Sequence, residues 1–200
     1  MEFVTFAKLI LQLEKRMFEK LKYKLLNRSI DQFIAEKKGS RLPDFERLNS
    51  MILIIEDLDK QTVRAIEDRI KTVFGITRSR FIIICEKALD DMLRSDQYCE
   101  VTTQDFGFMK VLTAEKQEEI RKLPMTHLLI NMAKKHSDIS DFMATLPNAS
   151  FRVSFQKSDH YGIYDLIIDT GKDSNPTNDI KVLYDYLQAL SGNPSELNAE

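Results

Sequence analysis

The chain has little cysteine and no long apolar segment. Its two cysteines, Cys85 and Cys99, are too few for a disulfide scaffold and lack the spacing of metal ligands. No apolar run approaches the roughly 18 to 20 residues that cross a bilayer. The N-terminus also lacks the pattern of a secretory signal, because Lys8 and Glu14 interrupt its apolar residues. These absences predict a cytoplasmic protein, in which Cys85, at the end of an apolar run, is a buried thiol.

Glycine is scarce as well, and the motifs that depend on it are missing. The first expected strand is followed by Glu56-Asp57-Leu58-Asp59, where a dinucleotide-binding fold would place Gly-x-Gly-x-x-Gly. The sequence has no Gly-x-Ser-x-Gly elbow, and its three histidines do not have the spacing of zinc ligands. It therefore gives no support to a NAD or FAD site, a P-loop or a zinc centre.

The net charge of -2 is distributed unevenly. Residues 1–50 hold 11 Lys+Arg against 7 Asp+Glu, a balance of +4, so the remaining residues hold 18 against 24, a balance of -6. A basic arm therefore precedes an acidic body. Only the arm would attract a polyanion, since the body would repel nucleic acid or an anionic membrane.

Apolar residues recur at helical spacing through this arm, from Phe3 to Ile34. The pattern predicts one long amphipathic helix, or two helices with a restart at Ser29, which has capping-box spacing to Gln32. Met17 also has the context of a natural start, in which case residues 1–16 are an upstream extension.

The arm carries a set of basic side chains that are candidate partner-binding residues. These are Lys15, Arg16, Lys20, Lys22, Lys24 and Arg28. One interpretation is contact with an acidic protein, RNA or an anionic membrane surface. The other is an ordinary solvated face on a helix whose apolar stripe docks on the body.

Continuous apolar runs in the body indicate strands that are covered on both faces. The segment 126–155 holds two such runs joined by a helix-length connection, which is typical of a parallel pair. With the other runs, they predict an α/β fold: a three-layer, Rossmann-like, mostly parallel sheet of about five strands with an N-terminal basic amphipathic helix. The expected strands are 51–55, 80–85, 126–133, 149–155 and 164–168, with 98–102 and 108–112 as short edge strands. The expected helices are 60–74, 87–94, 113–122, 138–146 and 179–190. The expected organisation is an arm (1–40), one α/β domain (41–190) and a disordered tail (191–200).

In open parallel sheets, ligands bind beyond the carboxyl ends of the strands. The ligand-crevice candidates at these ends are Glu56, Asp57, Glu86, Asn131 and Asp169, with Gln156 beside them. Most are acidic, so the crevice is expected to repel phosphate. Mg²⁺ is the conceivable cofactor, with Asp57, Asp59 and Asp169 as oxygen ligands. The Asp57-Leu58-Asp59 spacing also suits a haloacid-type phosphatase, but these carboxylates equally favour the N-terminus of the following helix.

Four segments, in this order and spacing, resemble a group of uncharacterised cytoplasmic proteins of Bacteroidota. They are Phe106-Gly107, Thr126–Asn131, Ala149–Val153 and Tyr164–Ile168. The likeness runs from about Met17 to Leu190, and His127 and Ser154 depart from it. It implies a fold and a host group, and it transfers no catalytic residue. A weaker likeness links 128–153 and 164–169 to the N-terminal Rossmann-like half of heptosyl-type glycosyltransferases, whose nucleotide-sugar site lies mainly in a second half that this chain lacks.

Two functional hypotheses follow from the sequence. The first is a non-catalytic α/β module that presents its basic helix to a partner. The second is a binder of a small molecule, such as a nucleotide or nucleotide sugar, or a weak Mg-dependent hydrolase. This second function would use the acidic crevice around Asp57, Asn131 and Asp169.

Overall fold

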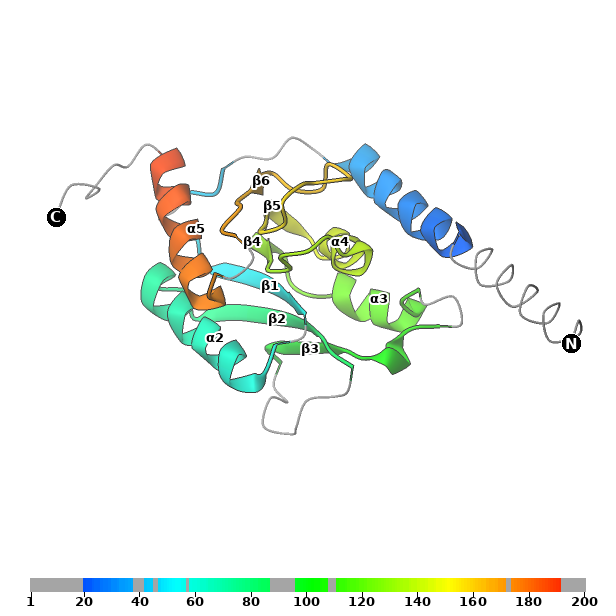
Figure 1. Cartoon of the computed structure of the whole chain (residues 1–200), viewed down its shortest axis with the longest axis horizontal. Coiled ribbons are helices and arrows are strands. Elements are labelled where there is room, and N and C mark those ends of the chain that lie inside the picture. Colours follow the sequence, from blue (N-terminus) through cyan, green and yellow to red (C-terminus); the bar gives the residue numbers. More distant parts are fainter. Residues whose placement is uncertain are drawn as a thin grey trace, which may run out of the picture.

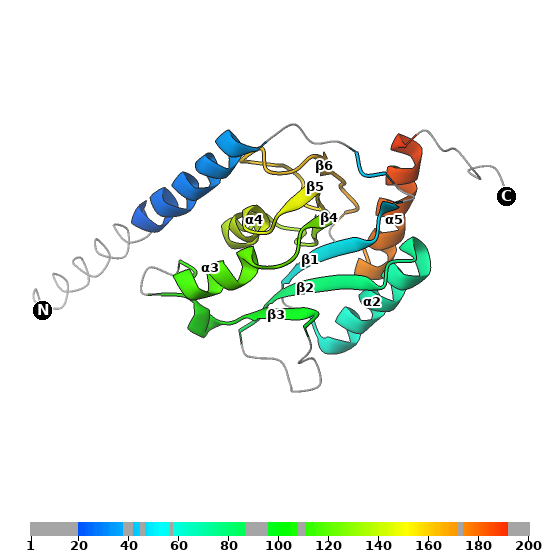
Figure 2. The ribbon, with the colours of Figure 1, turned by 180° about the vertical axis from the view of Figure 1, so that it is seen from behind.

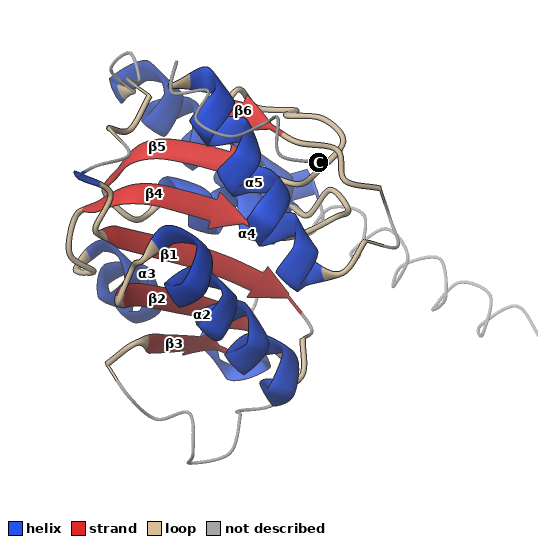
Figure 3. Cartoon of the chain, turned by 90° about the vertical axis from the view of Figure 1, so that its left-hand side faces the viewer, coloured by secondary structure: helices blue, strands red, loops and turns tan. Residues whose placement is uncertain are grey.

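The structure is a computed structural model that describes residues 20–37, 42–44, 47–56, 58–86, 96–107, 111–171 and 174–191. In these residues, six strands form one sheet in the order β3-β2-β1-β4-β5-β6, and each neighbouring pair is parallel (Figure 3). The strands are β1 (Ser50–Glu56), β2 (Arg78–Ile84), β3 (Tyr98–Val101), β4 (Thr126–Asn131), β5 (Ala149–Ser154) and β6 (Leu166–Ile167). This is the strand order of a Rossmann-like sheet, so the predicted fold class is confirmed. The sixth strand is β3, which pairs with β2 at the edge of the sheet, so the short edge strand predicted at 98–102 is confirmed.

Helices cover both faces of the sheet (Figure 1). Helices α2 (Lys60–Phe74) and α5 (Pro176–Leu190) pack on one face. The other face is covered by α3 (Ala114–Arg121), α4 (Asp138–Thr145) and the N-terminal helix (residues 20–36). Sheet and helices therefore form three layers with a core on each side of the sheet.

The alternation of side chains along β1 explains why both cores form. Met51, Leu53 and Ile55 point to the α2 and α5 side, while Ile52 and Ile54 point to the α3 and α4 side. Each of the five is at most 1% exposed. Burying a side chain of this size contributes on the order of 1.5 to 3 kcal/mol before entropy is counted. A continuous apolar run is thus what a central strand covered on two faces requires.

The N-terminal helix docks through its second half. Leu26 and Ile30 are 3% and 0% exposed in the core beside α4. The ring of Phe33 lies 4.6 Å from the guanidinium carbon of Arg152. Lys37 Nζ pairs with Asp165 Oδ1 at 2.6 Å and donates to the carbonyl of Ile163 at 2.8 Å. These contacts fix residues 26–37 on the body.

Several element boundaries differ from the expectation. The helix continues through Ser29, whose hydroxyl donates to the carbonyl of Leu25 at 3.2 Å, so the predicted restart is wrong. Strand β6 is limited to Leu166–Ile167, because Tyr164 turns into a buried cluster instead of joining the ladder. The expected helix 87–94 lies outside the described residues, as do 108–110 and the tail from 192.

The predicted burial of the Cys85 thiol is wrong, and the buried thiol is that of Cys99. Cys85 is only partly buried, because it follows the last residue of β2, where the chain leaves the sheet. Cys99, inside β3, is buried, and its Sγ donates to Glu119 Oε1 at 3.3 Å. Burial, with Glu119 close by, raises the pKa of the Cys99 thiol to about 12. It is therefore protonated and unreactive near neutral pH.

Candidate functional site

The strand order reverses between β1 and β4. The chain continues from β1 to β2 and β3 on one side of this point, and from β4 to β5 and β6 on the other side. In doubly wound sheets, the carboxyl ends at such a reversal form the usual ligand crevice. A pocket of about 310 Å³ lies at this point. It is lined by Glu56, Leu58, Met132, Ala133, Lys134, Lys135, Ser174 and Pro176. Ligand pockets range from about 300 to 1,000 Å³, so this one suits a small ligand.

The charged residues of this pocket, called here the reversal pocket, come from β1 and from the loop after β4. Glu56 is half-buried and accepts a hydrogen bond from Ser137 Oγ at 2.6 Å. Lys134 pairs with fully buried Asp179 of α5, and its Nζ lies 5.2 Å from the ring centre of Phe155. Lys135 is exposed. The lining holds one carboxylate and two ammonium groups, and Asp179, which pairs with Lys134, brings the local balance to two carboxylates against two ammonium groups.

Two helix N-termini lie near the strand ends, and each is capped by its own chain. Asp59 caps α2 by accepting hydrogen bonds from Thr62 N at 2.9 Å and Thr62 Oγ1 at 2.8 Å. The backbone bond from Thr62, followed by its side-chain bond, holds the pKa of Asp59 below its ordinary value. Asn175 caps α5 by accepting from Thr177 N at 3.0 Å. The capping interpretation of Asp59 is confirmed, and its carboxylate repels phosphate from the start of α2.

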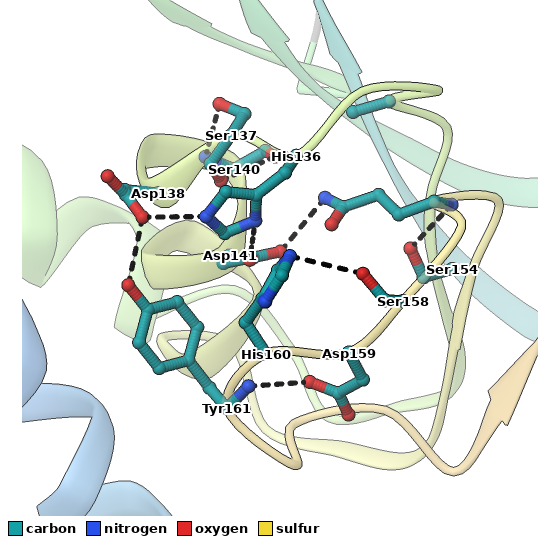
Figure 4. A network of polar contacts seen from close by, with 12 residues as sticks. His136, Ser137, Asp138, Ser140, Asp141, Ser154, Ser158, Asp159, His160 and Tyr161 are labelled. Carbon is teal, nitrogen blue, oxygen red and sulfur yellow. Dashed lines mark hydrogen bonds and ion pairs between the residues drawn. The ribbon is translucent and has the colours of Figure 1, made fainter.

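A polar network surrounds His136, at the start of α4 (Figure 4). Its Nε2 lies 3.0 Å from Asp138 Oδ1, and its Nδ1 lies 3.3 Å from Asp141 Oδ2. Tyr161 OH donates to the same Asp138 oxygen at 2.8 Å. The His160 ring centre lies 4.3 Å from that of His136. Both ring nitrogens of His136 are therefore engaged by carboxylates.

Asp141 joins this network to the interior. It is 1% exposed and accepts hydrogen bonds from Tyr164 OH at 2.7 Å and Gln156 Nε2 at 3.0 Å. Burial raises the pKa of Asp141, and the hydrogen bonds from Tyr164 and Gln156 oppose this shift because they stabilise the charged carboxylate. Asn131 Nδ2 donates to Tyr164 OH at 2.6 Å, and its Oδ1 accepts from Ala133 N at 3.0 Å. The network thus binds α4 to the loop between β5 and β6.

A family model matches residues 22–190, from the N-terminal helix to the last residue of α5. The chain belongs to the Family of unknown function (DUF6913). No curated protein matches this DUF6913 chain. No solved structure matches it. The family match does not extend to glycosyltransferases or to a host group, so those two parts of the resemblance stay predictions.

The structure brings together two of the ligand-crevice candidates of this DUF6913 chain. Glu56 lines the reversal pocket, and Asn131 ends the neighbouring strand β4, with its amide turned into the network beside α4. Glu86 and Asp169 are exposed at the ends of β2 and β6, and Asp169 lies 3.9 Å from Lys157. Asp57 lies outside the described residues. Across the described ranges, no group of three or more His, Cys, Asp or Glu side chains could hold a metal ion.

Lys134 and Lys135 are functional candidates that the sequence analysis missed. They follow the last buried residues after β4 directly, where a ligand in this fold would lie. Two adjacent lysines just after a predicted strand could have been recognised in the sequence as candidate ligand-binding residues. Their pairing with Asp179 and their closeness to Glu56 depend on the tertiary fold.

The partner-binding candidates stay at the surface where the structure describes them. Lys20, Lys24 and Arg28 are exposed, and Lys22 is half-buried with its Nζ 5.9 Å from the ring centre of Tyr23. Lys15 and Arg16 lie outside the described residues. None of the described helices is long and apolar enough to span a bilayer.

Proposed function

We propose that this DUF6913 chain is a non-catalytic binding module that holds a small anionic metabolite in the reversal pocket. The observation that carries the proposal is the position of this pocket, at the carboxyl ends of β1 and β4 where the strand order reverses. Nucleotides and nucleotide sugars are the class to test first. A mononucleotide-sized ligand suits the volume better than a dinucleotide.

The charge of the pocket favours an anion. Lys135 is exposed at the rim, and Lys134 adds a second ammonium group whose charge is partly offset by Asp179. Glu56, which also lines the pocket, can accept a hydroxyl or amine donor from the same ligand, and Met132 and Leu58 offer apolar contact. An anionic group joined to a hydroxylated apolar body matches this distribution.

A binding role, rather than catalysis, is supported by the state of the groups that could move protons. Glu56 accepts from Ser137, Lys134 pairs with Asp179, and His136 lies between two carboxylates. General acid–base catalysis needs a group within hydrogen-bond reach of the substrate and able to exchange a proton with it. In the described lining of the reversal pocket, Glu56 and Lys134 are thus engaged with other parts of the chain. We also propose a cytoplasmic location, which the low cysteine content supports.

The test is a thermal-shift and calorimetric screen with nucleoside phosphates, nucleotide sugars and sugar phosphates, each with and without Mg²⁺. Lys135→Glu should weaken binding of the best ligand by about tenfold or more, because it replaces an attractive charge with a repulsive one. Lys181→Glu is the matched control, since it makes the same charge change at an exposed position of α5.

Two results would count against the proposal. Absence of a shift with every anion, or equal effects of Lys135→Glu and Lys181→Glu, removes the reversal pocket as the site. Chromatography with and without Mg²⁺ shows whether the bound ligand is converted to a product. Product formation contradicts the proposal that the module is non-catalytic and favours the hydrolase.

A further inference from the structure

The N-terminal helix has a second apolar row that is exposed to solvent. Leu21 and Leu25 are 44% and 39% exposed, one helical turn apart. Each lies five residues before a docked side chain, Leu26 or Ile30, which places it roughly 140° around the helix axis from that side chain. The two rows therefore lie on different sides of one helix. In the described structure, only the docked row belongs to a buried core cluster.

The charges of this helix are also sorted along its length. Residues 20–28 carry four cations and no acid, whereas the two acids, Asp31 and Glu36, lie in the docked half. Lys20, Lys24 and Arg28 recur every four residues, so they form a row beside the exposed leucines. In the described part of the chain, none of these three cations forms an ion pair with a carboxylate. In both ribbon views, this half of the helix lies at the edge of the molecule (Figures 1 and 2).

We propose that the row of Leu21 and Leu25, with Lys20, Lys24 and Arg28 beside it, docks on an anionic lipid surface. An interfacial helix inserts its apolar row at the headgroup boundary while lysine and arginine stems extend to the phosphates. The adjacent rows on this helix provide both contacts.

Other occupants fit this surface less well. A second copy of the helix would bring like charges together, because residues 20–28 are purely cationic. RNA binding uses stacked aromatic or arginine groups and leaves exposed leucines without a role. A protein that encloses the helix in a groove would meet the body on the side of Leu26 and Ile30. A flat lipid surface can contact the row of Leu21 and Leu25 and the cations beside it without meeting the body.

The acidic body does not prevent this docking. Its formal charge of -6 is spread over residues 51–200, and the exposed row lies at the edge of the molecule. At physiological salt, charges more than about 8 Å apart are largely screened. The cations next to the lipid therefore dominate the interaction, and the predicted affinity falls as salt rises.

The test is cosedimentation of the full chain with phosphatidylcholine vesicles and with vesicles that also contain phosphatidylserine. The parent protein should bind only the anionic vesicles. Replacing Lys20, Lys24 and Arg28 together by Gln should weaken binding roughly a hundredfold, and replacing Leu21 and Leu25 by Gln about tenfold. Glutamine keeps the helix propensity close to that of the residues it replaces.

The matched control is Tyr186→Gln with Leu190→Gln, an exposed apolar pair on α5 at 52% and 53% exposure, which should leave binding unchanged. Circular dichroism and the unfolding temperature verify that each variant is folded. The proposal is overturned if the parent ignores anionic vesicles, or if the leucine variant binds them as well as the parent does. Tighter binding to single-stranded RNA than to the vesicles in the same buffer also overturns it.

Discussion

At the scale of single residues, Arg152 joins three parts of the molecule from inside β5. Its guanidinium donates to the carbonyls of Ala144 at 3.0 Å, Ala149 at 2.9 Å and Pro147 at 3.0 Å. Burial lowers the pKa of Arg152, while the Asp165 carboxylate opposes that shift. Phe33 of the N-terminal helix packs on its outer face. The side chain therefore satisfies carbonyls at the end of α4 and supports the docked helix.

Arg152→Lys should lower the free energy of unfolding by about 2 to 4 kcal/mol, because one ammonium group cannot satisfy three carbonyls arranged for a guanidinium fork. Urea denaturation followed by circular dichroism measures the change. Arg121→Lys is the control, since Arg121 ends α3 at the surface and bonds only to Gln117 in the described structure. A loss below about 0.5 kcal/mol for Arg152→Lys would show that water replaces these bonds.

At the scale of elements, α2 shows how a local signal sets a helix. Asp59 caps its start, Val63, Ile66 and Ile70 face the core, and Gly75 ends it with a φ of 67°, in the left-handed region that favours glycine. Each of these signals is readable in the sequence. The stability of α2 should therefore follow the charge of its capping carboxylate.

Asp59→Ala should lower the unfolding temperature at neutral pH and reduce the loss of stability in acid. The pKa of Asp59 is below its ordinary 3.8 in the folded protein, so its contribution is present above that value and disappears as pH falls through the lowered pKa. Thermal unfolding from neutral pH down to below 3.8 measures this. Asp68→Ala on the exposed side of the same helix is the control. Parallel pH profiles for the parent and Asp59→Ala would refute the assignment.

Three element boundaries were predicted wrongly from the sequence, each for a physical reason. The start of α5 was expected at Asp179, although Asn175 and Pro176 supply a cap and a first-turn proline that place it three residues earlier. The expected strand 164–168 was too long, because Tyr164 is apolar enough for a strand yet packs toward α4. Ser29 had capping-box spacing, but the docked residues Leu26 and Ile30 keep the helix continuous.

At the scale of the whole molecule, the stability of the sheet should decrease from its centre to its edges. β1 pairs with β2 over seven residues and with β4 over four, whereas β6 has two residues and pairs with β5 alone in the described structure. Hydrogen exchange measured by mass spectrometry should therefore be slowest in β1 and fastest in β6 among the strands. Equal protection of β6 and β1 would mean that the edge is covered by other contacts.

Contacts between distant parts of the chain limit what can be predicted about the site from the sequence. A parallel sheet brings strand ends to one edge, so the placement of Glu56 and Asn131 at the ends of neighbouring strands was predictable from two apolar runs. The pairing of Lys134 with Asp179 joins the end of β4 to the first turn of α5. The contact of His136 with His160 likewise depends on the path of the loop after β5. Such contacts follow from packing, which no local pattern reports.

The place of β1 at the sheet centre has a consequence for synthesis on the ribosome. Met51 pairs with Leu128 in β4, so one edge of β1 has no sheet partner until the chain has been translated past residue 128. Throughout that interval a nascent chain exposes backbone amides beside a strand with five consecutive apolar residues. Exposed edges of this kind favour association between chains. Translation speed between β1 and β4, and chaperone access to that stretch, therefore bear directly on the yield of folded protein.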